Sequence, residues 1–316
     1  MTHPFRFGVQ LQNLPPDAWR ERLASIEAQG YSSVFWPDHF HTQWEPVTAL
    51  AAAAAVTKRL VIGSLVYDVD YRHPVVLAKA AATLQLLSGG RHEFGIGAGW
   101  METDYREAGI PYDRPSVRIA RLAEALEILR RMWTQERTTF SGEHYQIEEV
   151  AKAVDPLPET PPKVLIGGGG RRVLGLAARA ADIIGINPSI PKGAVHADTP
   201  GDLSPERVLE KVRWVREAAE AGGRDPSAIE LTTLSFVVAI TDDPKPLREA
   251  LARNSPMTVE QIADCPLFIT GSPAEIRDTL ERRREATGIS YVVIQGKDPA
   301  LLESFAEAVV APLAGR

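Results

Sequence analysis

The chain has 316 residues, 44% hydrophobic and 24% charged, and its formal net charge of −6 argues against a nucleic-acid or anionic-membrane partner. Its one cysteine, Cys265, excludes internal disulfides and cysteine-based zinc sites. The first residues lack a basic segment followed by an apolar one, and no run approaches about 18 apolar residues, so we expect a cytoplasmic protein.

Short apolar runs alternate with helical patterns along the whole chain. The runs predict strands at 5–11, 33–36, 59–66, 92–99, 163–167, 182–187, 229–240 and 291–295. The segments between and after them predict helices at 19–29, 47–56, 74–90, 116–133, 173–181, 205–222, 272–288 and 300–311. Several strands are continuously apolar, which is typical of strands buried on both faces.

Eight such units predict an α/β fold, a (β/α)8 TIM barrel with a closed parallel sheet. The alternative, a doubly wound open sheet, would need a phosphate loop after the first strand, where QNLPPD stands. No Gly/Ser linker divides the chain, so we predict one domain over 1–316 with two insertions. The first, 134–162, is expected to hold a hairpin, and the second, 188–203, is a loop of the kind that forms a lid.

A glycine-rich turn joins the fifth strand to the next helix. Its residues are Gly167, Gly168, Gly169 and Gly170, followed by Arg171 and Arg172. A helix start offers free N–H groups and a positive dipole end, and bare backbone lets a ligand approach, so the turn predicts an anion site, most often for phosphate. The dinucleotide fingerprint is absent. Gly170 and Gly175 have the spacing of a P-loop, but Leu176 and Ala177 follow where that motif needs Lys and Ser or Thr. A flexible turn with two solvated arginines is the alternative.

Asp38 and His39 follow the second strand in the segment WPDHFH. A histidine at a barrel mouth can act as acid or base near neutral pH, and a neighbouring carboxylate can orient its ring or hold its proton. Ordinary loop hydrogen bonds are the alternative. His41 completes an H-x-H pair, but zinc would need further ligands at other strand ends, where His73 alone is near, so we predict no metal.

Two further strand ends carry candidate residues. After the third strand stand Tyr71, Arg72 and His73, of which we expect at least two to begin a helix or lie on the surface. After the fourth strand, Gly97 and Gly99 leave one backbone face bare, so that a flat ring or a phosphate could lie on it. The side chains that follow are Trp100, which stacks on a ring or covers the mouth, and Glu102.

Five segments, in order, resemble the bacterial luciferase-like monooxygenase superfamily, and within it the branch that uses the deazaflavin coenzyme F420. They are WPDHF (36–40), RHPVVLAKAAATLQLLSGGRHEFGIGAGW (72–100), RIARLAEALEILRRMW (118–133), PPKVLIGGGGRRVLGLAARAADIIGIN (161–187) and GSPAEIRDTLERRREATG (271–288).

The resemblance implies roles for these residues. His39 would lie near the reactive edge of the deazaflavin with Asp38 beside it, and Ser64–Leu65 would be a non-proline cis peptide against the ring. The other implied cofactor contacts are Gly97, Ala98, Gly99, Trp100, the turn Gly167–Gly170 with Arg171 at the phosphate, Arg172 toward the carboxylated tail, and Asn187. In the related sugar-phosphate dehydrogenases a catalytic glutamate stands where this chain has Trp100, and Glu102 lies two positions away. We therefore keep Glu102 as a catalytic candidate and do not carry the sugar-phosphate reaction over.

The resemblance implies an oxidoreductase that transfers a hydride between F420 and an organic substrate, works as a homodimer and draws reduced cofactor from a reductase. The alternative is an FMN-dependent two-component monooxygenase, which uses the same barrel and phosphate turn. A non-catalytic flavin-binding protein and a metal-dependent barrel hydrolase are the remaining hypotheses.

Overall fold

The computed structural model describes residues 3–316, which fold around a closed barrel of parallel strands. The order around the barrel is β3-β2-β1-β13-β10-β9-β8-β5, and a pairing between β3 and β5 closes it. The strands are β1 (Arg6–Gln10), β2 (Ser33–Trp36), β3 (Val61–Ser64), β5 (His92–Gly97), β8 (Lys163–Gly168), β9 (Ile183–Ile186), β10 (Glu230–Ser235) and β13 (Ile289–Gln295). The predicted TIM barrel is confirmed.

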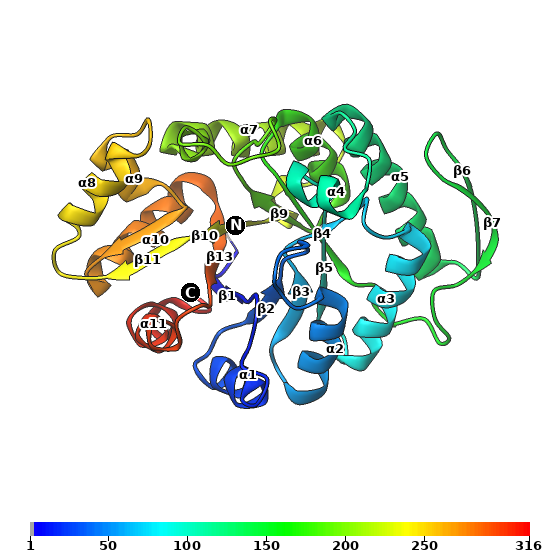
Figure 1. The fold of residues 1–316 in the computed structure, drawn as a ribbon, viewed down its shortest axis with the longest axis horizontal. Helices are drawn as coiled ribbons and strands as arrows, with labels where there is room; N and C mark the ends of the chain where they lie inside the picture. The colour runs from blue at the N-terminus through cyan, green and yellow to red at the C-terminus, as the bar shows by residue number, and fades with distance from the viewer. Residues whose placement is uncertain (1–2) are drawn as a thin grey trace.

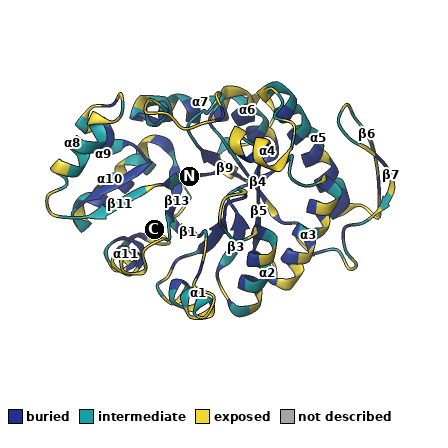
Figure 2. Ribbon diagram, in the orientation of Figure 1, coloured by how far each residue is buried: buried dark blue, intermediate teal, exposed yellow. Residues whose placement is uncertain are grey.

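Helices surround these strands, and the buried faces of both lie in the interior of the molecule (Figures 1 and 2). The helices are α1 (Trp19–Ala28), α2 (Pro46–Val56), α3 (Pro74–Leu87), α5 (Pro115–Thr134), α6 (Arg171–Ala180), α7 (Pro205–Ala221), α10 (Pro273–Thr287) and α11 (Pro299–Phe305). Many begin with proline, whose missing N–H costs nothing at that position. Within residues 3–316, no helix combines the length and apolar character that a membrane crossing requires.

The barrel interior is filled by side chains in two zones. An apolar cluster occupies its middle and consists of Phe35, Leu165, Ile183, Tyr291 and Val293. At the amino ends of the strands, Arg6 donates to Glu230 at 2.6 and 2.9 Å and to Glu93 at 2.9 Å. The amino end of the barrel therefore contributes to stability. In barrels of this kind the active site lies at the opposite end, where the strands have their carboxyl ends.

The predicted long strand 229–240 is wrong as a single element. β10 ends at Ser235, and β11 (Val237–Ile240) leaves the barrel to pair with β12 (Phe268–Gly271). Between β11 and β12 lie two helices that the sequence did not indicate, α8 (Lys245–Arg253) and α9 (Val259–Asp264), and Figure 1 shows this segment beside α10 at the edge of the molecule. A continuous apolar run cannot distinguish one strand from two with different partners.

Two other segments extend from the barrel. β6 (Arg137–Ser141) and β7 (Gln146–Ala151) pair antiparallel as a hairpin within 134–162, and they project from the opposite edge of the molecule (Figure 1). Residues 188–203 end in a 3-10 turn, η1 (Thr199–Leu203). Asp202 of this turn accepts from the backbone N–H of Ser189 at 2.7 Å, which ties the two ends of the loop together.

Candidate active site

His39 lies at the carboxyl end of β2 and is held by a buried carboxylate. Its Nδ1 atom is 2.6 Å from Oδ2 of Asp104, and the side chains are 20% and 1% exposed. Asp104 belongs to α4 (Glu102–Ala108), a short helix after β5. Because the buried carboxylate accepts from Nδ1, it holds the proton there and leaves Nε2 as the other reactive nitrogen.

Other polar groups converge on Asp104. The backbone N–H of Phe40 donates to Oδ1 at 3.4 Å, and the Tyr71 hydroxyl donates to Oδ2 at 3.3 Å. Nδ1 of His41 lies 3.8 Å from Oδ1, and the rings of His39 and His41 stack with centroids 5.0 Å apart. Burial, then Asp68 and Asp104, raise the pKa of Tyr71, so its hydroxyl remains a donor.

Asp38 does not have the role that its position beside His39 indicated. Its carboxylate accepts from both terminal nitrogens of Arg72, at 2.5 and 3.1 Å, and from the backbone N–H of Asp68 at 3.1 Å. Burial raises the pKa of Asp38, and the bonds from Arg72 oppose that shift. The two neighbours in sequence therefore have different partners, Arg72 for Asp38 and Asp104 for His39.

We expected at least two of Tyr71, Arg72 and His73 to begin a helix or lie on the surface, and this is wrong because only His73 does so. Only His73 begins a helix, since its ring nitrogen accepts from the N–H of Val75 as the N-cap of α3. Tyr71 and Arg72 instead complete the contacts of Asp104 and Asp38.

A second carboxylate cluster lies behind the first. The hydroxyl of Tyr105 donates to Asp68 at 2.9 Å and to Asp70 at 2.9 Å, and Asp70 pairs with Arg121 at 3.0 Å. Burial, together with the charge of Asp70, raises the pKa of Asp68 to about 7. This cluster fixes the loop after β3 against α4 and therefore positions Asp104.

The loop after β3 contains a non-proline cis peptide, one bond later than expected: it is Leu65–Val66 and not Ser64–Leu65. Ser64 still belongs to β3, where its hydroxyl donates to the carbonyl of Trp36 at 2.9 Å. The side-chain amide of Gln10 donates to the carbonyl of Leu65 at 3.0 Å. The side chains of Leu65 and Val66 are partly buried and pack against the apolar cluster inside the barrel.

Val66 lies beside two glycines that we expected to leave bare backbone: Gly97, for a flat ring or a phosphate, and Gly167, for an anion. A Cβ atom on Gly97 would lie 2.9 Å from Cγ2 of Val66, and one on Gly167 would lie 3.6 Å from Cγ1. The expectation of an open face at Gly97 is therefore wrong, because a protein side chain fills it. Contact between the cofactor and this strand end stays a prediction.

Position 99 requires glycine because of its backbone conformation and the side chain beside it. Its φ of +69° lies in the left-handed region, and a Cβ would collide with the hydroxyl of Tyr105. The adjacent carbonyl of Ala98 accepts from Nε of Arg118 at 3.0 Å. Trp100 follows and places its ring edge-on to His39, with centroids 5.7 Å apart, so it covers one side of the imidazole.

The four glycines of the turn differ in what surrounds them. A Cβ on Gly168 would collide with a methyl of Val173, and one on Gly169 would collide with the carbonyl carbon of Pro188. Gly170 alone is open, since a Cβ there would lie 3.7 Å from the Ser189 hydroxyl, and its φ of −85° is one that any residue adopts. Of the four glycines in the predicted anion site, we therefore keep Gly170, together with the start of the helix that follows it.

α6 begins at this open glycine. No side chain within residues 3–316 caps its first turn, so the leading N–H groups are free for an anion. Behind the turn, Lys211 of α7 is fully buried and donates to the carbonyls of Gly169 and Asn187, at 2.7 and 3.0 Å, and to Asp202 at 2.6 Å. Burial lowers the pKa of Lys211, and Asp202 opposes that shift. Lys211 thus holds the turn, Asn187 and the 188–203 segment together.

Arginines line a groove of about 480 Å³ between α5 and α6, which starts near the open end of the turn. Arg171, Arg172 and Arg179 contribute from α6 and Ser116 from α5. Arg171 lies 3.9 Å from Glu217, and within the described residues Arg172 and Arg179 form no ion pair.

Glu102 lies on the exposed side of α4, and its N–H donates to the carbonyl of Gly193 in the 188–203 segment at 3.1 Å. The acidic partner of His39 is two residues further along. The sequence predicted neither α4 nor its contact with His39, because a helix of seven residues is too short for its pattern to show which side faces the barrel. A catalytic role of Glu102 stays a prediction.

Among the site residues that the sequence missed, Lys211 carried a usable signal and Asp104 did not. Lys211 interrupts the apolar stripe formed by Val208, Val212 and Val215, and a charge on a buried stripe indicates a specific partner. Tyr71 and Arg72 carried no comparable signal.

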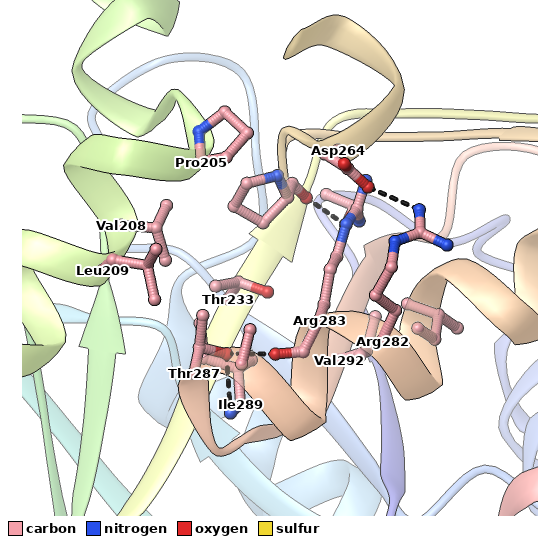
Figure 3. Close-up of a pocket in the computed structure, with 14 residues that line it drawn as sticks. Pro205, Val208, Leu209, Thr233, Asp264, Arg282, Arg283, Thr287, Ile289 and Val292 are labelled. Atoms are coloured by element: carbon pink, nitrogen blue, oxygen red, sulfur yellow. Dashed lines mark hydrogen bonds and ion pairs between the residues drawn. The ribbon is translucent and has the colours of Figure 1, made fainter. Parts of the chain in front are cut away.

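An apolar cavity elsewhere contains none of these residues. It has a volume of about 140 Å³ and lies between α7 and α10, where Val208 and Leu209 face Thr287 and Ile289 (Figure 3). The ion pair of Asp264 and Arg282 lies at its rim (Figure 3). The cavity is outside the barrel and separate from the strand ends that carry His39.

Comparisons with known proteins identify the family to which this chain belongs. The family model described as luciferase-like monooxygenase matches residues 1–264. An F420-dependent glucose-6-phosphate dehydrogenase of Kribbella flavida is 31% identical over 315 residues, 92% of each chain. One of Kineococcus radiotolerans is 31% identical over 256 residues, 77% of this chain and 71% of that one. An F420-dependent secondary alcohol dehydrogenase in complex with an F420–acetone adduct has the same fold, with a TM-score of 0.79, 19% identity, and 98% and 99% of the two chains covered. The chain belongs to the luciferase-like monooxygenase family.

Proposed function

We propose that this protein is an oxidoreductase that transfers a hydride between coenzyme F420 and an organic substrate. The observation that carries the proposal is the pair of His39 and Asp104, 2.6 Å apart at the same end of the barrel as the open helix start of α6. The names of the two curated relatives support F420 as the cofactor.

The residues present fit such a cofactor. The free N–H groups at Gly170 and Arg171 suit its phosphate, and the partly buried side chains of Leu65 and Val66 offer apolar contacts for a flat ring. When bound, the deazaflavin supplies the hydride chemistry. Its carboxylated tail continues beyond the phosphate, and the arginines of the α5–α6 groove suit that tail by charge.

His39 has the position and partner of a proton-transfer group. Asp104 holds the proton on Nδ1, so Nε2 is the atom that takes a proton from a substrate hydroxyl during oxidation, or returns one to a carbonyl during reduction. The rings of Trp100 and His41 lie against the imidazole, with centroids 5.7 and 5.0 Å away, and limit its contact with water.

The substrate stays open. Trp100 stands where the related sugar-phosphate dehydrogenases have an acid, and its ring only covers His39. A homodimer, a partner reductase and a cytoplasmic location stay predictions. For a dimer, α3 exposes Val76 and Leu87, which are eleven residues, or three turns, apart and so share one side of the helix.

The test is a tryptophan-fluorescence titration of the purified protein with F420, and with FMN in parallel. We expect saturable micromolar binding of F420 and weaker binding of FMN, which ends at the phosphate and cannot use the arginine groove. The reverse preference would overturn the proposal in favour of an FMN-dependent monooxygenase. If the protein bound neither cofactor, the assignment of the anion site to the turn before α6 would be wrong.

A second titration tests the arginine groove. F420 from which the glutamates have been removed should bind more weakly than the full coenzyme. This difference should disappear in the variant with Arg172→Ala and Arg179→Ala. The exposed Arg20 on α1, which stacks on Trp19, offers a matched control, because Arg20→Ala removes a surface charge far from the groove. A difference that survives in the double variant would exclude the groove as the site of the tail.

A further inference from the structure

We propose that His39, His41 and Asp104 form a binding site for a divalent transition-metal ion, with zinc as the preferred ion, and that this ion inhibits the enzyme reversibly. One donor atom from each residue lies within 4.8 Å of the others. We expected no metal because other strand ends offered no further ligand. That reasoning was incomplete, since the third ligand comes from helix α4.

The distances suit a small shared ion. Zinc binds imidazole nitrogen and carboxylate oxygen at about 2.0–2.2 Å, so tetrahedral ligand atoms lie roughly 3.3 Å apart. Nδ1 of His39 lies 2.6 Å from Oδ2 of Asp104, Nδ1 of His41 lies 3.8 Å from Oδ1, and one donor atom from each residue lies within 4.8 Å of the others, so small side-chain movements bring three ligand atoms to this spacing. His41 is 48% exposed, so its side chain can move by the small amount that is needed.

The arrangement of the ligands also favours metal binding. Each oxygen of Asp104 faces a different imidazole, and the two rings are nearly parallel, with an interplanar angle of 23°. The N–H of Phe40 and the hydroxyl of Tyr71 hold the carboxylate in place. Such outer contacts orient ligands and raise metal affinity. Three protein ligands leave a fourth position open at the barrel mouth for water or a substrate oxygen.

Binding of the ion would interfere with the proposed reaction, and this part of the inference rests on the proposed function. The ion takes Nδ1 of His39, which otherwise donates to Asp104. His39 then loses the hydrogen bond that orients its ring and keeps its proton on Nδ1. The predicted result is lower turnover, restored when a chelator removes the ion.

The experiment measures binding of the metal alone to the purified, chelator-treated protein without F420. Isothermal titration with Zn²⁺ should give one equivalent with micromolar or tighter affinity, and Co²⁺ should give the visible absorption of a four-coordinate site. His41→Gln should weaken binding by at least about 10-fold. His73→Gln is the matched control, because His73 caps α3 outside the cluster, and it should bind zinc like the unchanged protein.

The outcomes separate the site from the proposed function. No binding at millimolar zinc, or equal binding in the His41→Gln variant, would overturn the site. Zinc binding in a protein that binds no F420 would support the site and contradict the proposed function. Zinc binding that leaves the rate of F420-dependent turnover unchanged would overturn the inhibition.

Discussion

The Nδ1 atom of His39 lies 2.6 Å from Oδ2 of Asp104, although 65 residues separate them in the chain. One residue follows strand β2 and the other lies in α4, so the pair exists only after the barrel has closed and α4 has packed against its mouth. Phe40, Tyr71 and His41 also contact the carboxylate of Asp104, whose side chain is 1% exposed. The neighbouring Tyr105 bonds to Asp68 and Asp70 and so holds α4 against the loop after β3.

His39→Ala should remove most turnover and leave F420 affinity within a few fold. General acid–base groups typically contribute about 10²–10⁴-fold to a rate, and His39 contacts no part of the predicted phosphate turn. Steady-state kinetics with fluorescence titration of F420 check this. Turnover retained by the variant would remove His39 from the proton-transfer role.

Asp104→Asn should lower kcat by about 10–100-fold and leave KM within a few fold, because a neutral amide holds the His39 ring less firmly. Glu102→Gln is the matched control on the same helix. A larger loss in Glu102→Gln than in Asp104→Asn would assign the catalytic carboxylate to Glu102 and contradict the role of Asp104.

Gly170→Asp should weaken F420 binding sharply, because it places a carboxylate at the predicted phosphate position, whereas Gly170→Ala should bind normally. A side chain fits here, since the nearest atom to its Cβ would be 3.7 Å away. Gly169→Asp is a poor test, because any side chain at Gly169 would collide with the backbone of Pro188. Equal F420 affinity in the two Gly170 variants would place the phosphate elsewhere.

Asp68→Asn should change how the stability of the protein depends on pH. The folded-state pKa of Asp68 is about 7 and its ordinary value is 3.8, so between these values the folded state binds more protons than the unfolded state. Stability from this group is therefore present at low pH and is lost as pH rises toward 7. Relative to Asp68→Asn, the unchanged protein should lose about 2–4 kcal/mol between pH 4 and pH 8.

Chemical denaturation at several pH values measures this difference, and groups common to both proteins cancel. Parallel stability profiles of the two proteins would show that Asp68 is ionised throughout.

Arg6→Met should lower the free energy of unfolding by about 3–5 kcal/mol, because Glu93 and Glu230 would stay buried without their cation. Urea denaturation checks this, with Arg20→Met as the exposed control, which should change stability by less than about 0.5 kcal/mol. Adding Glu93→Gln to Arg6→Met should recover part of the loss. A loss that Glu93→Gln does not reduce would mean that the packing of the Arg6 side chain, and not its charge, stabilises this end.

The sequence by itself determined the barrel, the place of His39 at a strand end and the glycine turn before α6. Hydrophobic periodicity and glycine clusters are local properties, and short-range physics is enough to interpret them. The same locality explains the failure at 229–240, where a run of apolar residues divides between the barrel and a separate pair of strands.

Only the tertiary structure decided which groups meet at the barrel mouth. It pairs Asp38 with Arg72, gives Asp104 to His39, and fills the space over Gly97 with Val66. Each contact joins residues from different loops, and its partners depend on how short helices and turns pack once the eight strands converge. Periodicity determines which side of an element is buried, but it does not determine which distant side chain that buried side meets.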